Sequence, residues 1–204
     1  CKMNQLLPTI IRTLVAAATL SAAALTAHAQ GVTGDAQAGQ KKADMCIGCH
    51  GIPGYQNSFP EIHKVPMISG QTAQYIAASL AAYKKGERKH PSMRGIAGSL
   101  SEQDMADLGA FYASHAGKAA PDVPRTASTA AAALIEKGAC ASCHGANFSK
   151  PIDPSYPKLG GQHGAYVAKQ LTDFREGNRT NDGDTLIMRA IAAKLSNKDI
   201  AAVS

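Results

Sequence analysis

The sequence contains one five-residue pattern twice, and its residue types could anchor an iron porphyrin. Cysteines stand at the first and fourth positions and histidine at the fifth, in Cys46–His50 and again in Cys140–His144. This Cys-x-x-Cys-His spacing is typical of c-type haem attachment, in which both thiols add to vinyl groups of the porphyrin and the neighbouring histidine reaches the iron. The pattern therefore predicts two covalently bound haem c groups. The predicted attachment residues are Cys46, Cys49, Cys140 and Cys143, and the predicted proximal iron ligands are His50 and His144.

Two other uses of paired cysteines fit this chain less well. Structural zinc sites commonly place their two cysteine pairs roughly 15–20 residues apart, whereas 90 residues separate Cys49 from Cys140. A thioredoxin-like dithiol would need a nearby βαβ pattern, which the sequence does not show. Zinc binding and dithiol redox chemistry are therefore the less favoured alternatives.

Most of the chain is an internal repeat that extends beyond the two motifs. Equivalent residues are 94 positions apart at the cysteines, 91 at Pro66 and Pro157, and 95 at Met93 and Met188. Small loop insertions account for the drift in spacing. A repeat of this length predicts two homologous haem domains in tandem.

The sixth iron ligand separates electron transfer from chemistry at an open iron, because a methionine ligand favours electron transfer. The repeat selects Met93 and Met188, which occupy equivalent positions. Met67 and Met105 of the first copy align with residues other than methionine. Bis-histidine ligation is the less favoured alternative, because no further histidine recurs in both copies. The histidines concerned are expected at loops or helix ends, and they are His63, His90, His115 and His163.

Two further pairs in the repeat are expected near the haem groups. The backbone carbonyl of Pro66 or Pro157 could accept the N–H of the proximal histidine and so fix the ring and its tautomer. A simple turn proline is the alternative. Arg88 and Arg179 are expected either to face haem propionates or to be solvated charges at helix ends.

The repeat is predicted to consist of helices joined by loops, and no segment alternates clearly enough to predict a strand. The predicted helices lie at 36–45, at 72–85 and after Ser101 in the first copy, and at 129–138, at 164–176 and after Ser196 in the second. Asp104 follows Ser101 at the spacing of a capping box. We expect an all-α fold, and we expect the natural chain to continue the last helix beyond Ser204.

The N-terminal segment has the layout of a secretory signal peptide. Lys2 and Arg12 precede a mostly apolar run that ends in an Ala-His-Ala cleavage pattern before Gln30. The run is short for a membrane-spanning helix, which needs about 20 residues, although a retained anchor is the alternative. Cys1 has no predicted role. The predicted divisions are a signal peptide or anchor at 1–29, a first domain at 30–116, a linker with Pro121 and Pro124 at 117–128, and a second domain at 129–204.

The charge of the chain gives no indication of nucleic-acid binding. The formal net charge is +6. Without Lys2 and Arg12 the chain has 19 basic against 15 acidic residues, and four haem propionates would bring this +4 close to zero. No strong basic patch with interleaved aromatic residues is present, which argues against a nucleic-acid partner.

With these residues in place, the chain resembles the cytochrome c4 family of bacterial di-haem proteins over nearly all of the predicted mature region. The resemblance rests on both haem motifs, on Gly70-Gln71 and Gly161-Gln162, on Gly86-Glu87-Arg88, and on the stretches around Met93 and Met188. It implies an all-α fold of two tandem cytochrome-c-like domains related by an approximate two-fold axis, with haem propionates directed toward the interface. Met67 departs from the family pattern, which more usually has a residue without sulfur there.

The resemblance also implies electron transfer rather than catalysis. Such a carrier would work in the periplasm between the cytochrome bc1 complex as donor and a terminal oxidase, often of the cbb3 type, as acceptor. Peripheral or anchored membrane association is common in the family. The alternatives are a permanent cytochrome subunit of a dehydrogenase or oxidase, and a di-haem peroxidase or thiosulfate-oxidising enzyme. An enzyme would need an open or labile iron site, against which the Met93 and Met188 pair argues.

Overall fold

The computed structural model describes residues 32–59, 61–115, 127–183 and 185–204. The chain divides into two compact units, Cys1–Thr33 and Gly34–Ser204. The predicted signal peptide at 1–29 lies outside the described residues, as do residues 117–126 of the predicted linker. Every contact discussed below belongs to the second unit.

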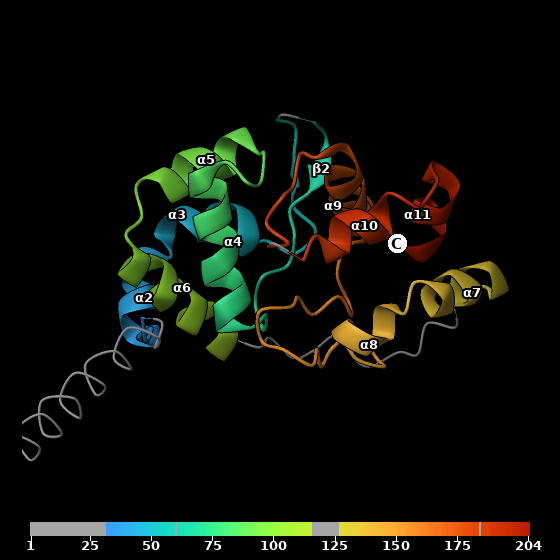
Figure 1. Cartoon of the computed structure of the whole chain (residues 1–204). Helices are drawn as coiled ribbons and strands as arrows, with labels where there is room; N and C mark the ends of the chain where they lie inside the picture. The colour runs from blue at the N-terminus through green and yellow to red at the C-terminus, as the bar shows by residue number, and fades with distance from the viewer. Residues whose placement is uncertain (1–31, 60, 116–126, 184) are drawn as a thin grey trace, which may run out of the picture. The chain divides into compact units, whose positions relative to one another are not determined.

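The described residues are mostly helical, as the sequence predicts (Figure 1). The helices of the first repeat are α2 (Ala36–Lys42), α3 (Asp44–His50), α4 (Ala73–Lys85), α5 (Pro91–Gly98) and α6 (Glu102–Ser114). Those of the second are α7 (Thr129–Lys137), α8 (Cys140–His144), α9 (Gly164–Glu176), α10 (Ile187–Ala192) and α11 (Asn197–Val203). A two-stranded antiparallel sheet joins β1 (Gln56–Asn57) to β2 (His63–Lys64), with Gln56 opposite Lys64. No described helix combines the length and apolarity needed to cross a membrane.

Local sequence signals explain the ends of the longer helices. The Thr72 hydroxyl accepts a hydrogen bond from the Tyr75 backbone N–H at 3.2 Å and so caps α4. Gly86 ends this helix at φ 82°, a left-handed conformation that glycine adopts without steric cost. The capping box at Ser101 and Asp104 is complete, since each side chain accepts from the other's backbone N–H. Three of the sequence-predicted helix ends are thereby confirmed.

The helix predicted over 36–45 ends earlier than expected. The Ala43 backbone N–H bonds to the Gln40 carbonyl only three residues back, which tightens the last turn and breaks the regular ladder after Lys42. The chain then starts α3 at Asp44, so that the first Cys-x-x-Cys-His motif is itself helical. The short hairpin was also not predicted, because two residues per strand are too few to show alternation.

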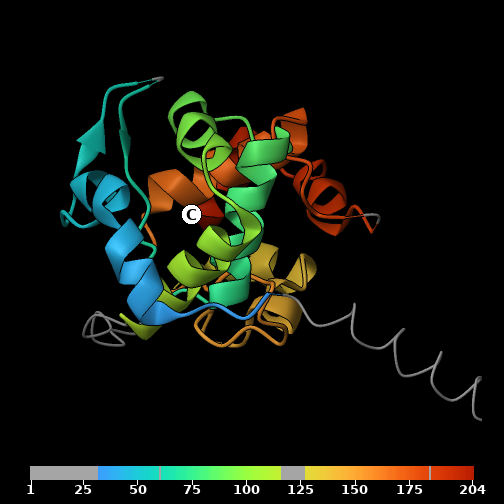
Figure 2. The same ribbon diagram turned by 90° about the vertical axis from the view of Figure 1, so that its left-hand side faces the viewer.

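The core of the first domain lies where α4 crosses α6 and α2 packs on α6. Ile76 and Leu80 of α4 meet Leu108 and Phe111 of α6, all buried. Burying each of these side chains stabilises the fold by about 1.5–3 kcal/mol before conformational entropy is subtracted. Figure 2 shows α2 and α3, in blue, following one another toward the β1–β2 hairpin.

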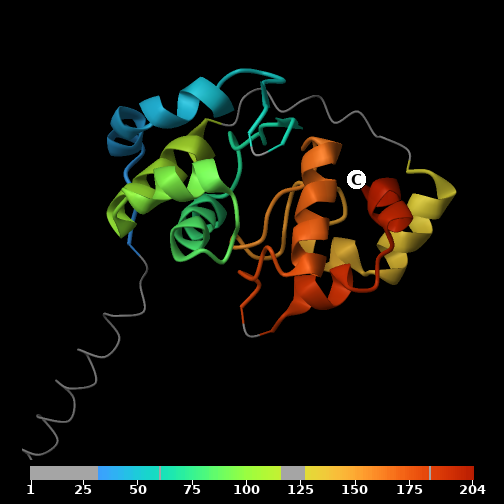
Figure 3. The ribbon, with the colours of Figure 1, turned by 90° about the horizontal axis from the view of Figure 1, so that it is seen from above.

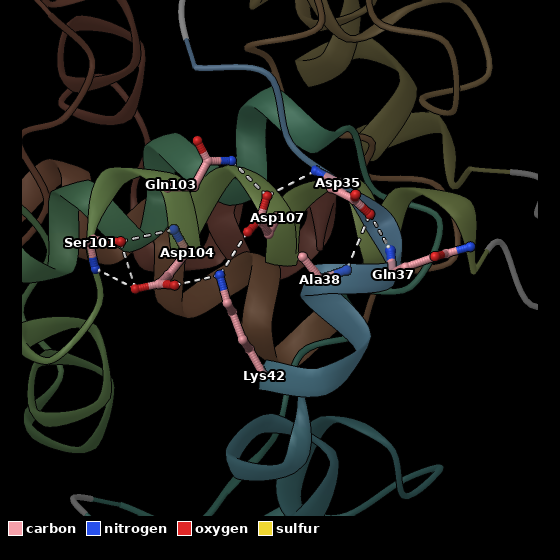
Figure 4. A network of polar contacts seen from close by, with 8 residues as sticks. All are labelled: Asp35, Gln37, Ala38, Lys42, Ser101, Gln103, Asp104 and Asp107. Atoms are coloured by element: carbon pink, nitrogen blue, oxygen red, sulfur yellow. Dashed lines mark hydrogen bonds and ion pairs between the residues drawn. The ribbon is translucent and has the colours of Figure 1, made fainter.

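A polar network fastens α2 to α6 (Figure 4). The buried Asp107 carboxylate accepts hydrogen bonds from the Asp35 backbone N–H at 2.9 Å, from Lys42 Nζ at 2.7 Å and from Gln103 Nε2 at 2.8 Å. Lys42 also forms an ion pair with Asp104 at 2.5 Å. Because α3 follows α2 directly, this network fixes the position from which the first haem motif starts.

The second domain repeats the arrangement with a shorter last helix, α11. In Figure 3, α11, in red, lies against α7, in yellow, and α9, in orange, stands beside them. Phe174 of α9, Ala192 of α10 and Ile200 of α11 are buried. Ser196 and Asp199 form a second complete capping box at the start of α11.

Reciprocal hydrogen bonds relate the two domains by a pseudo-two-fold axis. The Lys89 N–H donates to the Asn178 carbonyl at 3.0 Å, and the Thr180 N–H donates to the Glu87 carbonyl at 2.7 Å. Glu87 and Asn178 are equivalent in the repeat, and so are Lys89 and Thr180, so exchanging the domains converts one bond into the other. The β1–β2 hairpin has no counterpart among residues 127–183 and 185–204. Glu61, in the loop of the hairpin, pairs with Lys169 of α9 at 3.5 Å.

Arg88 and Arg179 lie buried within this interface, with 3% and 6% exposure. Arg88 Nη2 donates to the Tyr166 hydroxyl at 2.8 Å, and Arg179 Nη2 donates to the Tyr75 hydroxyl at 3.3 Å. Both arginines also donate to the Gln170 side-chain oxygen, at 2.7 and 2.8 Å. The expectation that these arginines are solvated charges at helix ends is therefore wrong. Their burial follows from partners supplied by the other domain, which no local pattern reveals.

Candidate haem-binding sites

The two Cys-x-x-Cys-His motifs form short helices, α3 and α8. A helical turn places residues three apart on one face, so Cys46 and Cys49 share a face, as do Cys140 and Cys143. All four thiols are free and half-buried. Burial raises the pKa of Cys46 and of Cys140.

Each motif histidine is held by a proline carbonyl. His50 Nδ1 lies 2.9 Å from the Pro66 carbonyl oxygen, and His144 Nδ1 lies 3.0 Å from the Pro157 carbonyl oxygen. A carbonyl can only accept, so Nδ1 must carry the hydrogen in both rings. This leaves the Nε2 lone pair of each neutral imidazole available for a metal. The expectation that Pro66 and Pro157 orient the histidines is confirmed in both domains.

The protonation state of these histidines suits metal binding. Burial lowers the pKa of His50, while its bond to the Pro66 carbonyl acts in the opposite direction and is the weaker effect. Burial likewise lowers the pKa of His144. Both imidazoles are therefore neutral at pH 7, which is the form that binds iron.

The predicted methionine ligands lie on α5 and α10. Met93 is half-buried and packs against the first-domain core, as does Cys46. Met188 is half-buried on α10, which packs on α9. Of the other candidates, Met105 is 4% exposed within the α4–α6 core, and Met67 is 43% exposed. The sequence pattern did not predict α5, although Pro91 at its first turn is a known helix-start signal.

The four other histidines of the described residues lie at element ends, as expected. His90 precedes α5, His163 precedes α9, His115 follows α6, and His63 begins β2. Within residues 32–59, 61–115, 127–183 and 185–204, no three His, Cys, Asp or Glu side chains gather as a metal cluster.

The donors in each domain fit a haem c group. Each domain offers two free thiols for attachment to the porphyrin, one neutral imidazole with its second nitrogen fixed, and one half-buried thioether. The imidazole and the thioether are borderline and soft donors that suit iron in a porphyrin better than hard cations. Large apolar side chains are exposed beside the motifs and the methionine helices, where an apolar cofactor would cover them. They are Met45, Ile47 and Ile52 in the first domain and Ile152, Leu186 and Ile187 in the second.

Comparisons with known proteins agree with these sites. Residues 128–204 match the cytochrome c family model. Cytochrome c4 of Pseudomonas aeruginosa is 44% identical over 210 aligned positions, covering 99% of this chain and 96% of that protein. The crystal structure of reduced recombinant cytochrome c4 from Pseudomonas stutzeri superposes with a TM-score of 0.64 at 41% identity, covering 84% of this chain and 96% of that one. The thiosulfate dehydrogenase electron acceptor of Thiomonas intermedia is 31% identical, covering 99% of this chain and 92% of that protein.

These matches cover both halves of the repeat, so the fold comprises two tandem cytochrome-c-like domains and the cofactors are two covalently bound haem c groups. Because the two cytochrome c4 proteins are 44% and 41% identical to this chain and cover most of its length, the chain belongs to the cytochrome c4 family of electron-transfer proteins.

Proposed function

We propose that the chain is a periplasmic electron carrier with one haem in each domain, residues 30–116 and 129–204. Thioether bonds would join the haems to Cys46, Cys49, Cys140 and Cys143. The axial iron ligands would be His50 and Met93 in the first domain and His144 and Met188 in the second. The observation that carries this proposal is the matched pair of histidine–proline hydrogen bonds, because it presents one Nε2 atom per domain in the tautomer that binds iron.

The proposed ligands favour a carrier over an enzyme. The bound haem supplies one-electron exchange between ferrous and ferric iron. Histidine and methionine hold both oxidation states, and methionine ligation raises the reduction potential. An iron bound on both faces leaves no position for peroxide or another substrate. A peroxidase-like activity therefore has no support from Met93 and Met188, which recur in both domains.

The partners follow from this assignment. We propose the bc1 complex as donor and a terminal oxidase as acceptor, with residues 1–29 directing export or serving as a membrane anchor. Contact areas should be small, below about 1,200 Å², because electron-transfer encounters are transient. A thiosulfate dehydrogenase is a second candidate donor, favoured by the similarity to the Thiomonas intermedia protein. Co-purification with a membrane complex would instead indicate a permanent subunit.

Redox titration of the holoprotein with optical and spin-resonance detection tests the axial assignment. Met93→Ala and Met188→Ala should each abolish the red-region charge-transfer band of one ferric haem and lower that haem's potential, leaving the other unchanged. Met67→Ala is the matched control, since this methionine is exposed and lacks a counterpart. A spectrum unchanged in Met93→Ala and Met188→Ala would refute the assignment.

A further inference from the structure

The helices that carry the two proposed methionine ligands are fastened by different side chains. In the first domain, His90 is the N-cap of α5, and its Nδ1 accepts a hydrogen bond from the Met93 backbone N–H at 3.3 Å. In the second domain, Leu186 stands at the N-cap of α10 with φ 50° and provides no side-chain cap. The equivalent helices therefore start in different ways despite the repeat.

A carboxylate outside α10 takes over this role in the second domain. Asp182 Oδ2 accepts a hydrogen bond from the Arg189 backbone N–H at 2.9 Å, and Oδ1 accepts one from Arg189 Nε at 2.7 Å. The Asp182 side chain is 4% exposed. Arg189 directly follows Met188, so this two-point contact fixes the backbone beside the proposed ligand.

The position of the backbone at Met93 and next to Met188 determines where the methionine sulfur atom can lie. Met93 is the third residue of α5, and the bond to His90 joins the backbone N–H of Met93 itself. A cap satisfies an otherwise unpaired N–H group of the first turn and holds that turn in helical geometry. A side chain that must reach an iron from the first turn depends on that geometry.

The hydrogen bonds that His90 and Asp182 accept differ in strength. The bond to His90 is single and long, at 3.3 Å, with an imidazole nitrogen as acceptor. Asp182 makes two short bonds, one of them to a guanidinium, and hydrogen bonds between charged groups are roughly twice as strong as neutral ones. The backbone that carries Met93 is therefore the more easily displaced of the two.

We propose that His90 and Asp182 are positioning residues that hold Met93 and Met188 at the irons, and that the weaker fastening makes Met93 the more easily displaced ligand. This inference rests on the axial ligands proposed above. Methionine ligation favours ferrous iron, so the difference should be greatest in the ferric protein, where an external ligand competes best with sulfur.

Imidazole titration of the ferric holoprotein tests the inference. Loss of each charge-transfer band reports displacement of one methionine, and the Met93→Ala and Met188→Ala variants assign the bands to domains. In the wild type, imidazole should displace Met93 at the lower concentration. His90→Ala should raise the apparent imidazole affinity of the first haem by roughly threefold to tenfold, the typical effect of losing a helix cap. His90→Asn, which restores a good cap, should return the affinity to within about twofold of the wild type.

Two controls separate positioning from general stability. Ser101→Ala removes a cap from α6 in the same domain, on a helix without a proposed ligand, and should leave imidazole binding unchanged. Asp182→Ala should raise the imidazole affinity of the second haem only, by about tenfold or more. Asp182→Asn keeps the shape of the side chain and should give a smaller rise at the same haem.

The outcomes distinguish this inference from the function on which it rests. A ferric wild type without charge-transfer bands would overturn the axial assignment itself. If both bands are present but His90→Ala and Asp182→Ala leave the imidazole affinities unchanged, only the positioning role fails. Equal effects of Ser101→Ala and His90→Ala would also overturn that role, because they would trace the change to the stability of the domain.

Discussion

Gln170 should be one of the strongest single contributors to the contact between the domains. Its side-chain oxygen accepts hydrogen bonds from Arg88 of the first domain at 2.7 Å and from Arg179 of the second at 2.8 Å. Both guanidinium groups are buried. Replacing Gln170 by methionine keeps the approximate volume and removes the shared acceptor.

The expected loss follows from the two bonds. Each hydrogen bond to a charged donor contributes about 1.5–3 kcal/mol. The arginines keep their tyrosine partners, so we expect Gln170→Met to lower the free energy of unfolding by about 2–4 kcal/mol rather than by the full sum. For a chain of this size the melting temperature should fall by roughly 2–4 °C for each kcal/mol.

Calorimetry of the holoprotein measures this effect, and a second variant tests its cause. Gln170→Glu supplies a carboxylate between two positive charges, and the Asp173 carboxylate, 3.5 Å from Gln170 Nε2, opposes it only in part, so this variant should melt close to the wild type and well above Gln170→Met. Gln162→Met is the matched control at the same interface, since its amide bonds only to neutral backbone groups, those of Met67 and His163, and should cost less. If Gln170→Met melts like the wild type, or if Gln170→Glu is as unstable as Gln170→Met, the electrostatic account of this interface is wrong.

Two further predictions concern the first domain. Hydrogen bonds from the Asp35 backbone N–H and then from Lys42 hold the pKa of Asp107 below its ordinary value of 3.8. The stability that this ionised carboxylate provides is complete above pH 3.8 and is lost as the pH falls toward the lower folded value. The free energy of unfolding of the wild type should therefore decrease as the pH is lowered below about 4. If the free energy of unfolding of Asp107→Asn depends on pH as steeply as that of the wild type, this network is not the cause. A Cβ atom on Gly39 would lie 2.1 Å from the Asp107 carbonyl oxygen, so Gly39→Ala should destabilise the domain by about 1–3 kcal/mol in denaturant titrations. Gly98→Ala, with no atom within 4 Å of the new Cβ, should be neutral or stabilising by up to about 1 kcal/mol, and equal losses in both variants would contradict the packing argument.

Long helices that end at a glycine could be predicted from the sequence. The helix predicted at 164–176 has those bounds in the structure, and Thr72 and Gly86 delimit α4 as their residue types indicate. By contrast, α5 and α10 comprise eight and six residues, too few for a periodic apolar pattern to be recognised. Such short helices depend on tertiary contacts, as with Asp182 and Arg189, rather than on intrinsic propensity.

Some contacts at and between the candidate sites could also be predicted from the sequence, and others could not. The bonds from His50 to Pro66 and from His144 to Pro157 could be anticipated, because the repeat marks both prolines at a similar distance after the motifs. The burial of Arg88 could not be anticipated. Its partners Tyr166 and Gln170 lie 78 and 82 residues along the chain, in the other domain. Side chains that act across an interface leave no local signal in a single sequence.

The two domains thus share the support of the histidine on one side of each proposed iron and differ in the support of the methionine on the other. Both histidines are held by equivalent proline carbonyls at nearly the same distance, 2.9 and 3.0 Å, so this hydrogen bond offers no basis for a difference between the haems. The methionine side differs in its helix length and in the residue that fastens it, His90 against Asp182. Two haems with identical surroundings would have equal potentials, and electrons would show no preference between the domains. Any difference in potential that arises from ligand geometry should therefore originate on the methionine side, where gene duplication left the histidine support intact and the support of the sixth ligand diverged.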